Sequence, residues 1–189
     1  ASSVSTLTSI ENVTLASNGQ NGVWGSAGAN VITGGGAIDY ISGGAGNDTI
    51  SGLAGADNLD GGAGNDSFNY LLLADLFTTQ ASVDTIAGGT GTDIITAGTT
   101  GTAFTIADND VWTTRITSIE TIKLNANNAT TNTINLDVTA YAAGVRTIDA
   151  SAVTGATGNT IDISEFVATG ATTLTGSATG STIFTGGAG

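Results

Sequence analysis

The chain has 189 residues and a formal charge of −13, because 16 acidic side chains stand against three basic ones. Those three, Arg115, Lys123 and Arg146, are too few to displace the counterions of a nucleic acid or to hold an anionic membrane surface. Histidine and cysteine do not occur in the sequence, which excludes thiol nucleophiles, histidine-based triads, disulfides and the usual zinc sites. No apolar run reaches the roughly 18 residues that span a bilayer, so we predict no transmembrane segment.

The composition favours short strands and turns over helices, since 29 residues are glycine and only 10% are charged. Residues 1–15 are predicted to be an entry segment. Its sequence Thr8-Ser9-Ile10-Glu11-Asn12-Val13-Thr14-Leu15 returns with few changes as Thr117-Ser118-Ile119-Glu120-Thr121-Ile122-Lys123-Leu124.

A nine-residue repeat runs from residue 16 to residue 96, and its clearest units start at Gly34, Gly43, Gly52 and Gly61. The clearest units open with small residues, and every unit carries a polar residue at position six and an apolar residue at position eight. Position six is occupied by Asn21, Asn30, Asp39, Asp48, Asp57, Asp66, Asp75, Asp84 and Asp93. Position eight is occupied by Val23, Ile32, Ile41, Ile50, Leu59, Phe68, Phe77, Ile86 and Ile95.

The repeat predicts an all-β fold, a parallel β-roll or β-helix solenoid with calcium-binding turns. The glycine-rich positions can turn tightly, the last three positions form a short strand, and two repeat units wind into one coil. Apolar residues at position eight then face one another across a thin interior. Turns of successive coils stack, so one edge is expected to carry Asn30, Asp48, Asp66 and Asp84. The other is expected to carry Asn21, Asp39, Asp57, Asp75 and Asp93.

Columns of aspartates repel one another unless cations lie between them. Calcium suits these turns, because it takes roughly six to eight oxygens from carboxylates and backbone carbonyls in flexible loops, whereas magnesium prefers octahedral geometry and retained water. We expect the aspartates at position six, together with Asn30, to bind Ca2+ with backbone oxygens of Gly34, Gly36, Gly43, Ala45, Gly52, Ala54, Gly61 and Ala63. Asn21 and Asn30 offer one neutral oxygen each and are expected to form weak end sites.

Two units from Tyr70 to Ala87 keep the aspartate and apolar positions but lack the glycines, which are replaced by Tyr70, Leu73, Thr79 and Ser82. For Asp75 and Asp84 an ordinary turn residue is therefore as good an interpretation as a calcium ligand. These two units are candidates for bulging out of the roll, and Leu71–Phe77 is a candidate for a short helix.

The pattern G-G-x-G-x-D-x-U-x, where U is a large apolar residue, resembles the nonapeptide of the RTX family over residues 25–69 and again over 88–96. The resemblance implies a calcium-binding parallel β-roll in a bacterial protein exported by a type I system. It also implies a chain that stays unfolded in the calcium-poor cytosol and folds outside the cell.

After the roll (16–96) we predict a transition (97–116) and a second, metal-free β-solenoid (117–189). Within the latter, segments starting at Thr133, Thr147, Thr160, Thr173 and Thr182 alternate polar and apolar residues, as strands do. The last residues return to a Gly-Gly-Ala-Gly pattern, which looks like the start of another calcium loop. Trp24 and Trp112 flank the roll and are expected to pack at its ends.

The leading functional prediction is a structural module of a bacterial cell-surface protein, similar to a surface-layer protein or an RTX adhesin, that is secreted and assembles on binding calcium. The alternative is the non-catalytic folding and secretion module of a secreted hydrolase or toxin. An ice- or glycan-binding solenoid is less well supported, because the threonines form no regular ladder. We expect no catalytic residue and no enzyme activity. The expected partners are calcium and copies of the chain, other cell-surface proteins or glycans.

Overall fold

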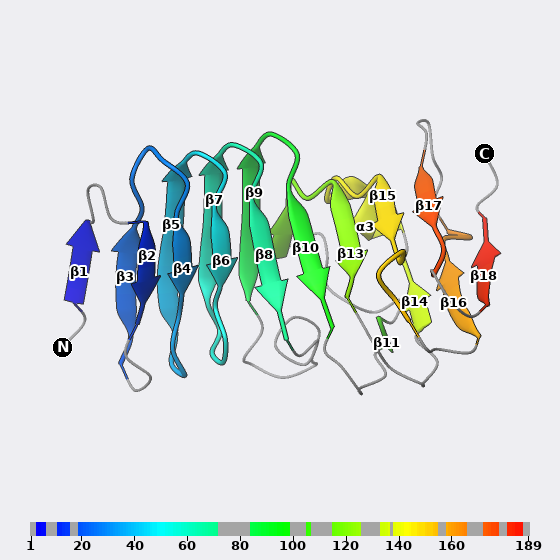
Figure 1. The fold of residues 1–189 in the computed structure, drawn as a ribbon, viewed down its shortest axis with the longest axis horizontal. Coiled ribbons are helices and arrows are strands. Elements are labelled where there is room, and N and C mark those ends of the chain that lie inside the picture. The colour runs from blue at the N-terminus through cyan, green and yellow to red at the C-terminus, as the bar shows by residue number, and fades with distance from the viewer. Residues whose placement is uncertain are drawn as a thin grey trace.

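The computed structural model describes residues 3–6, 11–15, 19–71, 84–98, 105–106, 115–125, 133–136, 138–154, 158–165, 172–177 and 181–186. These residues form an elongated stack of short strands with one short helix (Figure 1). The strands are β1 (Ser3–Thr6), β2 (Asn12–Thr14), β3 (Asn21–Trp24), β4 (Val31–Thr33), β5 (Asp39–Ala45), β6 (Thr49–Ser51), β7 (Asn58–Ala63), β8 (Ser67–Tyr70), β9 (Thr85–Thr90), β10 (Ile94–Ala97), β11 (Thr105–Ile106), β12 (Ile116–Thr117), β13 (Thr121–Leu124), β14 (Thr133–Asn135), β15 (Thr147–Asp149), β16 (Asn159–Asp162), β17 (Thr173–Thr175) and β18 (Thr182–Thr185).

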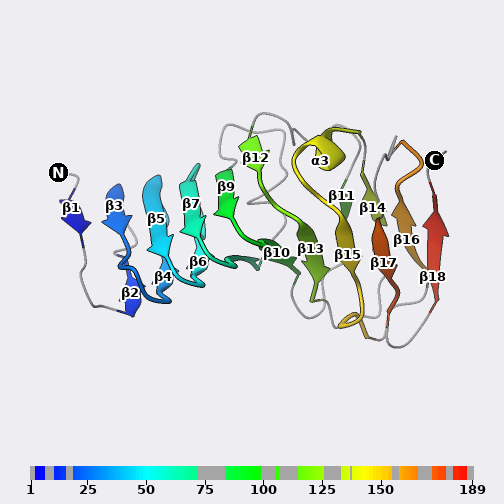
Figure 2. The same cartoon turned by 90° about the horizontal axis from the view of Figure 1, so that it is seen from above.

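The strands form three sheets, and every strand pairs in parallel with its neighbours. Sheet A has the order β1-β3-β5-β7-β9-β12 and sheet B has the order β17-β15-β13-β10-β8-β6-β4-β2. Sheet C has the order β11-β14-β16-β18. Figure 2 shows odd-numbered strands β3 to β9 in one row and even-numbered strands β4 to β10 in the other. Consecutive strands therefore alternate between two sheets, and the fold is the predicted parallel β-roll solenoid.

The register of the sheets gives the length of each coil. Val31 pairs with Thr49 and Thr49 with Ser67, so each of these coils is two nonapeptides long, as predicted. The next step differs, because Ser67 pairs with Ile94, and in sheet A Asn58 pairs with Thr85. Each of these steps is three nonapeptides long, so the length of one nonapeptide lies outside the regular winding between β8 and β9. The two glycine-poor units noted in the sequence lie in this interval.

The core of the roll consists of apolar side chains that its two sheets direct toward each other. The residues at position eight that the structure describes are Val23, Ile32, Ile41, Ile50, Leu59, Phe68, Ile86 and Ile95, and each is 2% exposed or less. This confirms the predicted interior, because a strand of alternating pattern can bury only the side chains of one face. Phe77 lies outside the described residues.

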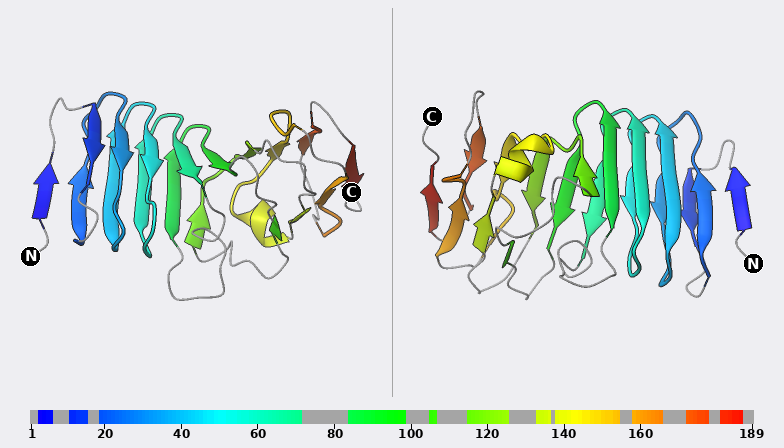
Figure 3. Two further views of the ribbon diagram at one scale, coloured as in Figure 1. Left: turned by 60° about the horizontal axis from the view of Figure 1, so that its bottom comes forward. Right: turned by 180° about the vertical axis from the view of Figure 1, so that it is seen from behind.

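Beyond the roll, sheet B continues without interruption while sheet C takes the place of sheet A. Ile94 pairs with Thr121, Thr121 with Thr147, and Thr147 with Thr173. Helix α3 (Val138–Ala142), seen in Figure 3, buries Ala140 and ends before Gly144, which has a φ of 117°. The sequence pattern did not predict this helix. The limits of the segments 1–15, 16–96, 97–116 and 117–189 stay predictions.

Some predictions made from the sequence differ from the structure, and others concern residues that the structure does not describe. Trp24 does not pack inside the end of the roll, because its side chain is 40% exposed on sheet A. Asp75 and Trp112 lie outside the described residues. So does the segment Leu71–Phe77, in which a helix was expected, except for Leu71 itself. In the part of the chain that the structure describes, no helix is long and apolar enough to cross a membrane.

Candidate calcium centre

The residues at position six form two stacked columns, one at each edge of the roll. The first column contains Asn30, Asp48, Asp66 and Asp93, each immediately before a strand of sheet B. The second column contains Asn21, Asp39, Asp57 and Asp84, at the start of strands of sheet A or just before them. All six aspartates are 2% exposed or less, although carboxylates are seldom buried without partners.

The membership of the columns corrects one prediction. The unbroken nine-residue period predicts Asp84 next to Asp66 and Asp93 in the opposite column. In the structure, the backbone N–H of Asp57 donates to Asp84 Oδ1 at 2.8 Å, and that of Asp66 donates to Asp93 Oδ1 at 2.8 Å. The one nonapeptide length outside the winding moves both aspartates to the other edge.

Within each column one carboxylate oxygen joins neighbouring coils. The N–H of Asn30 donates to Asp48 Oδ1 at 2.7 Å, and the N–H of Asp48 donates to Asp66 Oδ1 at 2.7 Å. In the second column the N–H of Asp39 donates to Asp57 Oδ1 at 2.8 Å. Every one of these carboxylates thus accepts from the coil before it, and the column has a direction.

The second oxygen of the first-column aspartates has no protein donor. Oδ2 of Asp48, Asp66 and Asp93 is buried and makes no hydrogen bond in the structure. A buried carboxylate oxygen without a partner costs several times what an ordinary hydrogen bond returns, so such an atom indicates a cation that the protein chain itself does not supply.

Electrostatics agree with this geometry. Burial raises the pKa of Asp48 to about 6, with a smaller contribution from the charge of Asp66, against the hydrogen bond from Asn30. Burial likewise raises the pKa of Asp66 and of Asp93, and the charge of Glu120 adds to the effect at Asp93. These carboxylates are therefore hard to ionise in the protein alone, and a divalent cation beside them would reverse that.

The first glycine of each unit lines the same space. A Cβ on Gly61 would come within 2.5 Å of the Gly88 carbonyl oxygen and would meet Asp66 Oδ2. A Cβ on Gly43 would lie 2.7 Å from the Gly61 carbonyl oxygen and would meet Asp48 Oδ2. Glycine is needed here because carbonyl and carboxylate oxygens of successive coils converge on the hydrogen that replaces its side chain. Oxygen donors of these two kinds are the ligands that calcium prefers, so the residues fit the ion.

The backbone carbonyls of repeat positions one and three, which were both predicted to bind calcium, belong to residues of different exposure. Gly34, Gly43, Gly52 and Gly61, at position one, are buried beside the aspartates. At position three, Gly36, Ala54 and Ala63 are exposed and Ala45 is half-buried. The Ala63 carbonyl also accepts a backbone hydrogen bond from Gly46 at 2.7 Å. The structure therefore brings the position-one oxygens to the columns and leaves the position-three oxygens nearer the rim.

In the second column, Oδ2 of Asp39 and of Asp84 accepts a hydrogen bond from the protein. Gly35 N–H donates to Asp39 Oδ2 at 2.7 Å, and the Tyr70 hydroxyl donates to Asp84 Oδ2 at 2.7 Å. The neutral Tyr70 hydroxyl thus binds Asp84, the aspartate that follows the interval between β8 and β9. We therefore rank Asp48, Asp66 and Asp93 above Asp84 as calcium ligands.

One functional candidate is missed by reasoning from the sequence. Glu120 lies one coil beyond Asp93, and the N–H of Asp93 donates to Glu120 Oε2 at 2.7 Å. The available signal was the Thr-Ser-Ile-Glu repeat, which is not part of the nonapeptide pattern. Among the residues that the structure describes, no three carboxylates gather in one place, so any calcium site here relies on backbone oxygens as well.

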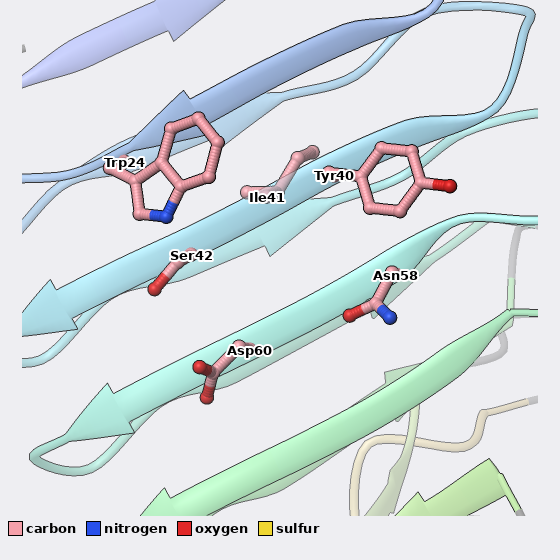
Figure 4. Close-up of a pocket in the computed structure, with 6 residues that line it drawn as sticks. All are labelled: Trp24, Tyr40, Ile41, Ser42, Asn58 and Asp60. Atoms are coloured by element: carbon pink, nitrogen blue, oxygen red, sulfur yellow. The ribbon is translucent and has the colours of Figure 1, made fainter. Parts of the chain in front are cut away.

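A shallow groove of about 190 Å³ lies away from the columns, on the outer face of sheet A. It is lined by Trp24, Tyr40, Ile41, Ser42, Asn58 and Asp60, shown in Figure 4. Trp24 pairs with Ser42 and Ser42 with Asp60, so these three side chains follow one row across β3, β5 and β7. Tyr40 is 47% exposed and adds a second aromatic ring to the groove.

Comparison with known proteins identifies the repeat. The family model described as RTX calcium-binding nonapeptide repeat (4 copies) matches residues 16–37, 33–68 and 74–99. No curated protein and no solved structure matches the chain. The matched residues include both columns and the glycines beside them, and the repeats of this family bind Ca2+. This part of the chain therefore consists of RTX calcium-binding nonapeptide repeats.

Proposed function

We propose that the chain is a calcium-stiffened structural module of a bacterial cell-surface protein, of the surface-layer or adhesin kind, that folds after type I secretion. The observation that carries the proposal is the buried first column, in which Asp48, Asp66 and Asp93 each keep one oxygen without a protein donor. Such a column is unfavourable in calcium-poor cytosol and favourable where calcium is abundant.

In each of these aspartates, one carboxylate oxygen joins neighbouring coils and the other is available to the ion. Oδ1 of each aspartate accepts the N–H of the preceding coil, which fixes the spacing of the turns. Oδ2 and the position-one carbonyls supply oxygen ligands. Calcium, when bound, supplies the positive charge that neutralises the column. Because each ion would contact two coils, binding stiffens the stack along its axis.

A structural role also agrees with the residue types of the chain. The sequence has no histidine or cysteine, and the described aspartates at position six of the repeat belong to the two columns. RTX repeats are typically structural. We therefore propose that the isolated chain turns over no polysaccharide or ester, and a measured turnover of either would contradict the proposal.

Assembly is the part of the proposal that distinguishes a surface protein from a secretion module. Sheets with parallel strand edges can be extended by further strands, and β18 at one edge of sheet C exposes Ile183 and Phe184. With a charge of −13, two chains repel one another unless cations intervene. Calcium should therefore promote association more than sodium does at the same ionic strength.

Light scattering across a calcium titration tests this point, with sodium chloride of equal ionic strength as the control. Growth of particle mass with calcium alone supports the surface-protein proposal. A particle that stays monomeric up to millimolar calcium would favour the secretion module of a hydrolase or toxin instead.

A carbohydrate ligand is a second candidate function, favoured by the groove that contains Trp24 and Tyr40 beside Ser42, Asn58 and Asp60. Exposed aromatic rings next to amide and carboxylate groups can stack on a sugar and bind its hydroxyls. Titration calorimetry with bacterial surface oligosaccharides should then show binding that Trp24→Ala abolishes. Heats that are the same for both proteins would remove this candidate.

A further inference from the structure

The first column does not end with the last nonapeptide. The strand β13 follows β10 in sheet B, and Thr121 pairs with Ile94. Glu120 therefore takes the position that Asp93 holds one coil earlier. Its carboxylate makes the same contact as the aspartates do, since Oε2 accepts the N–H of Asp93 at 2.7 Å.

The carbonyl that completes a calcium loop also has a counterpart in this coil. In the repeat, a Cβ on Gly61 would meet Asp66 Oδ2 and the carbonyl of Gly88, the first glycine of the next unit. A Cβ on Gly88 would meet Asp93 Oδ2 at 2.6 Å and the carbonyl oxygen of Ser118. Ser118 thus presents its carbonyl where the position-one glycine would, although it is no glycine and belongs to no nonapeptide.

The turn at residues 118–120 differs from a nonapeptide turn in its length and backbone conformation. Glu120 follows Ser118 by two positions, whereas Asp93 follows Gly88 by five. Ser118 adopts a φ of 54°, in the left-handed region that residues with a side chain seldom enter. Such strained positions concentrate at functional sites, where the surrounding structure fixes them.

A buried acceptor points to a ligand in the same place. Asp93 is fully buried, and its Oδ2 has no hydrogen-bond partner in the structure. That oxygen faces the space between Gly88 and the Ser118 carbonyl. The Glu120 carboxylate lies beside the same residue, because its Oε2 accepts the N–H of Asp93 at 2.7 Å. Oxygens of Asp93, Ser118 and Glu120 therefore meet between these two coils.

From these contacts we propose a terminal calcium site formed by Asp93 Oδ2, the Ser118 carbonyl and the Glu120 carboxylate, one coil beyond the last RTX unit. The proposal rests on calcium binding by the roll. It places a ligand set in residues 118–120, outside the segments that the repeat family matches, 16–37, 33–68 and 74–99.

The repeated sequence Thr-Ser-Ile-Glu gives the site a context. Its first copy places Glu11 just before β2, where the N–H of Val31 donates to the Glu11 carbonyl. Its second copy places Glu120 just before β13. In sheet B, β2 and β13 enclose the four nonapeptide strands β4, β6, β8 and β10. The two copies therefore bracket the calcium roll at its two ends.

The next coil shows why the column stops. Thr147 pairs with Thr121, so Arg146 takes the position that follows Glu120 in the column. Its guanidinium donates to the carbonyls of Tyr141 and Val145 at 2.8 Å and lies 3.6 Å from the centre of the Tyr141 ring. A fixed positive charge at this position offers no ligand for a further cation.

Calorimetric titration of the full chain with calcium chloride tests the site. Glu120→Gln keeps an oxygen to accept the N–H of Asp93 and removes only the charge, so the fold should persist. We expect this variant to bind one calcium fewer per chain, or to bind that ion at least tenfold more weakly. Glu165→Gln is the matched control, because Glu165 is an exposed glutamate outside the column, and it should titrate like the unmodified chain.

The same calcium stoichiometry and affinity in Glu120→Gln would overturn the proposal. Should that variant fail to fold, an anomalous-scattering map of the unmodified chain crystallised with calcium decides the matter. A peak between Asp93 and the Ser118 carbonyl supports the site. Peaks beside Asp48 and Asp66 without one there would reject the terminal site and leave calcium binding by the roll intact. A chain that binds no calcium at all would reject both.

Discussion

Each first-column aspartate has two oxygens with different duties. In Asp66, Oδ1 accepts the N–H of Asp48, while Oδ2 lies beside Gly61 and near the carbonyl of Gly88. The hydrogen bond to Oδ1 needs only an acceptor and would survive in an amide. Ion binding through Oδ2 needs the negative charge. The two duties can therefore be separated by a single substitution.

Asp66→Asn should bind calcium at least about tenfold more weakly, because a ligand charge is lost while the contact to the Asp48 N–H can remain. Glu165→Gln is the control, since Glu165 is exposed outside the columns and its substitution changes the net charge equally. Calorimetric titration of both variants measures the difference. Equal weakening in the two would mean that only net charge matters.

The raised pKa values predict how the metal-free chain responds to pH. The pKa of Asp48 rises from 3.8 to about 6, and those of Asp66 and Asp93 also rise. The folded state then holds protons that the unfolded state has already released, so stability contributed by these groups is full below pH 4 and is lost as the pH rises through 6. In calcium-free buffer, the strand signal in circular dichroism should therefore be stronger at pH 4.5 than at pH 7. The opposite order would show that these carboxylates are stabilised as anions without metal.

At the scale of the turn, glycine is required at Gly43, where the oxygens converge, and is dispensable at Gly28, where the space is open. A Cβ on Gly43 would meet Asp48 Oδ2 and the Gly61 carbonyl, whereas one on Gly28 would find its nearest atom 3.9 Å away. Gly43→Ala should destabilise the calcium-bound chain by about 1–3 kcal/mol through overpacking, and should weaken calcium binding. Gly28→Ala should leave both unchanged. Thermal unfolding in saturating calcium compares the variants, and equal midpoints would refute the convergence of oxygens at Gly43.

The strands of the roll were predictable because the sequence repeats every nine residues. Ile50 and Phe68 at position eight identified the interior, since one phase of the repeat can face only one side of the sheet. The exchange of Asp84 and Asp93 between columns was not predictable from that period. The column to which each belongs depends on how many residues separate β8 from β9. The missing glycines after Tyr70 indicate where the repeat becomes irregular but not how long the irregular interval is.

Glu120 was missed for a different reason. It lies the length of three nonapeptides beyond Asp93, in a turn of its own shape with Ser118 at a φ of 54°. That turn does not belong to the nonapeptide pattern. The fold also adds α3 (Val138–Ala142) in a threonine- and alanine-rich stretch that reads as strand and turn, and whose helical turn is completed by packing of Ala140 into the core.

At the scale of the whole molecule, folding of residues 16–96 should depend on calcium. The apolar interior contributes one side chain per unit, and the buried carboxylates oppose it until cations are bound. Metal that binds only the folded state adds its binding free energy to stability. Circular dichroism of the chain in excess chelator at pH 7 should therefore show loss of strand signal, restored by adding calcium in excess. A spectrum that is the same with and without metal would mean that the apolar interior suffices.

The most direct measurement of the central claim is an anomalous-scattering map from crystals of the unmodified chain grown with calcium. We expect peaks between successive coils of the first column, beside Asp48 with the Gly61 carbonyl and beside Asp66 with the Gly88 carbonyl. A map without peaks at these turns, or with peaks only on the outer faces of the sheets, would contradict that claim.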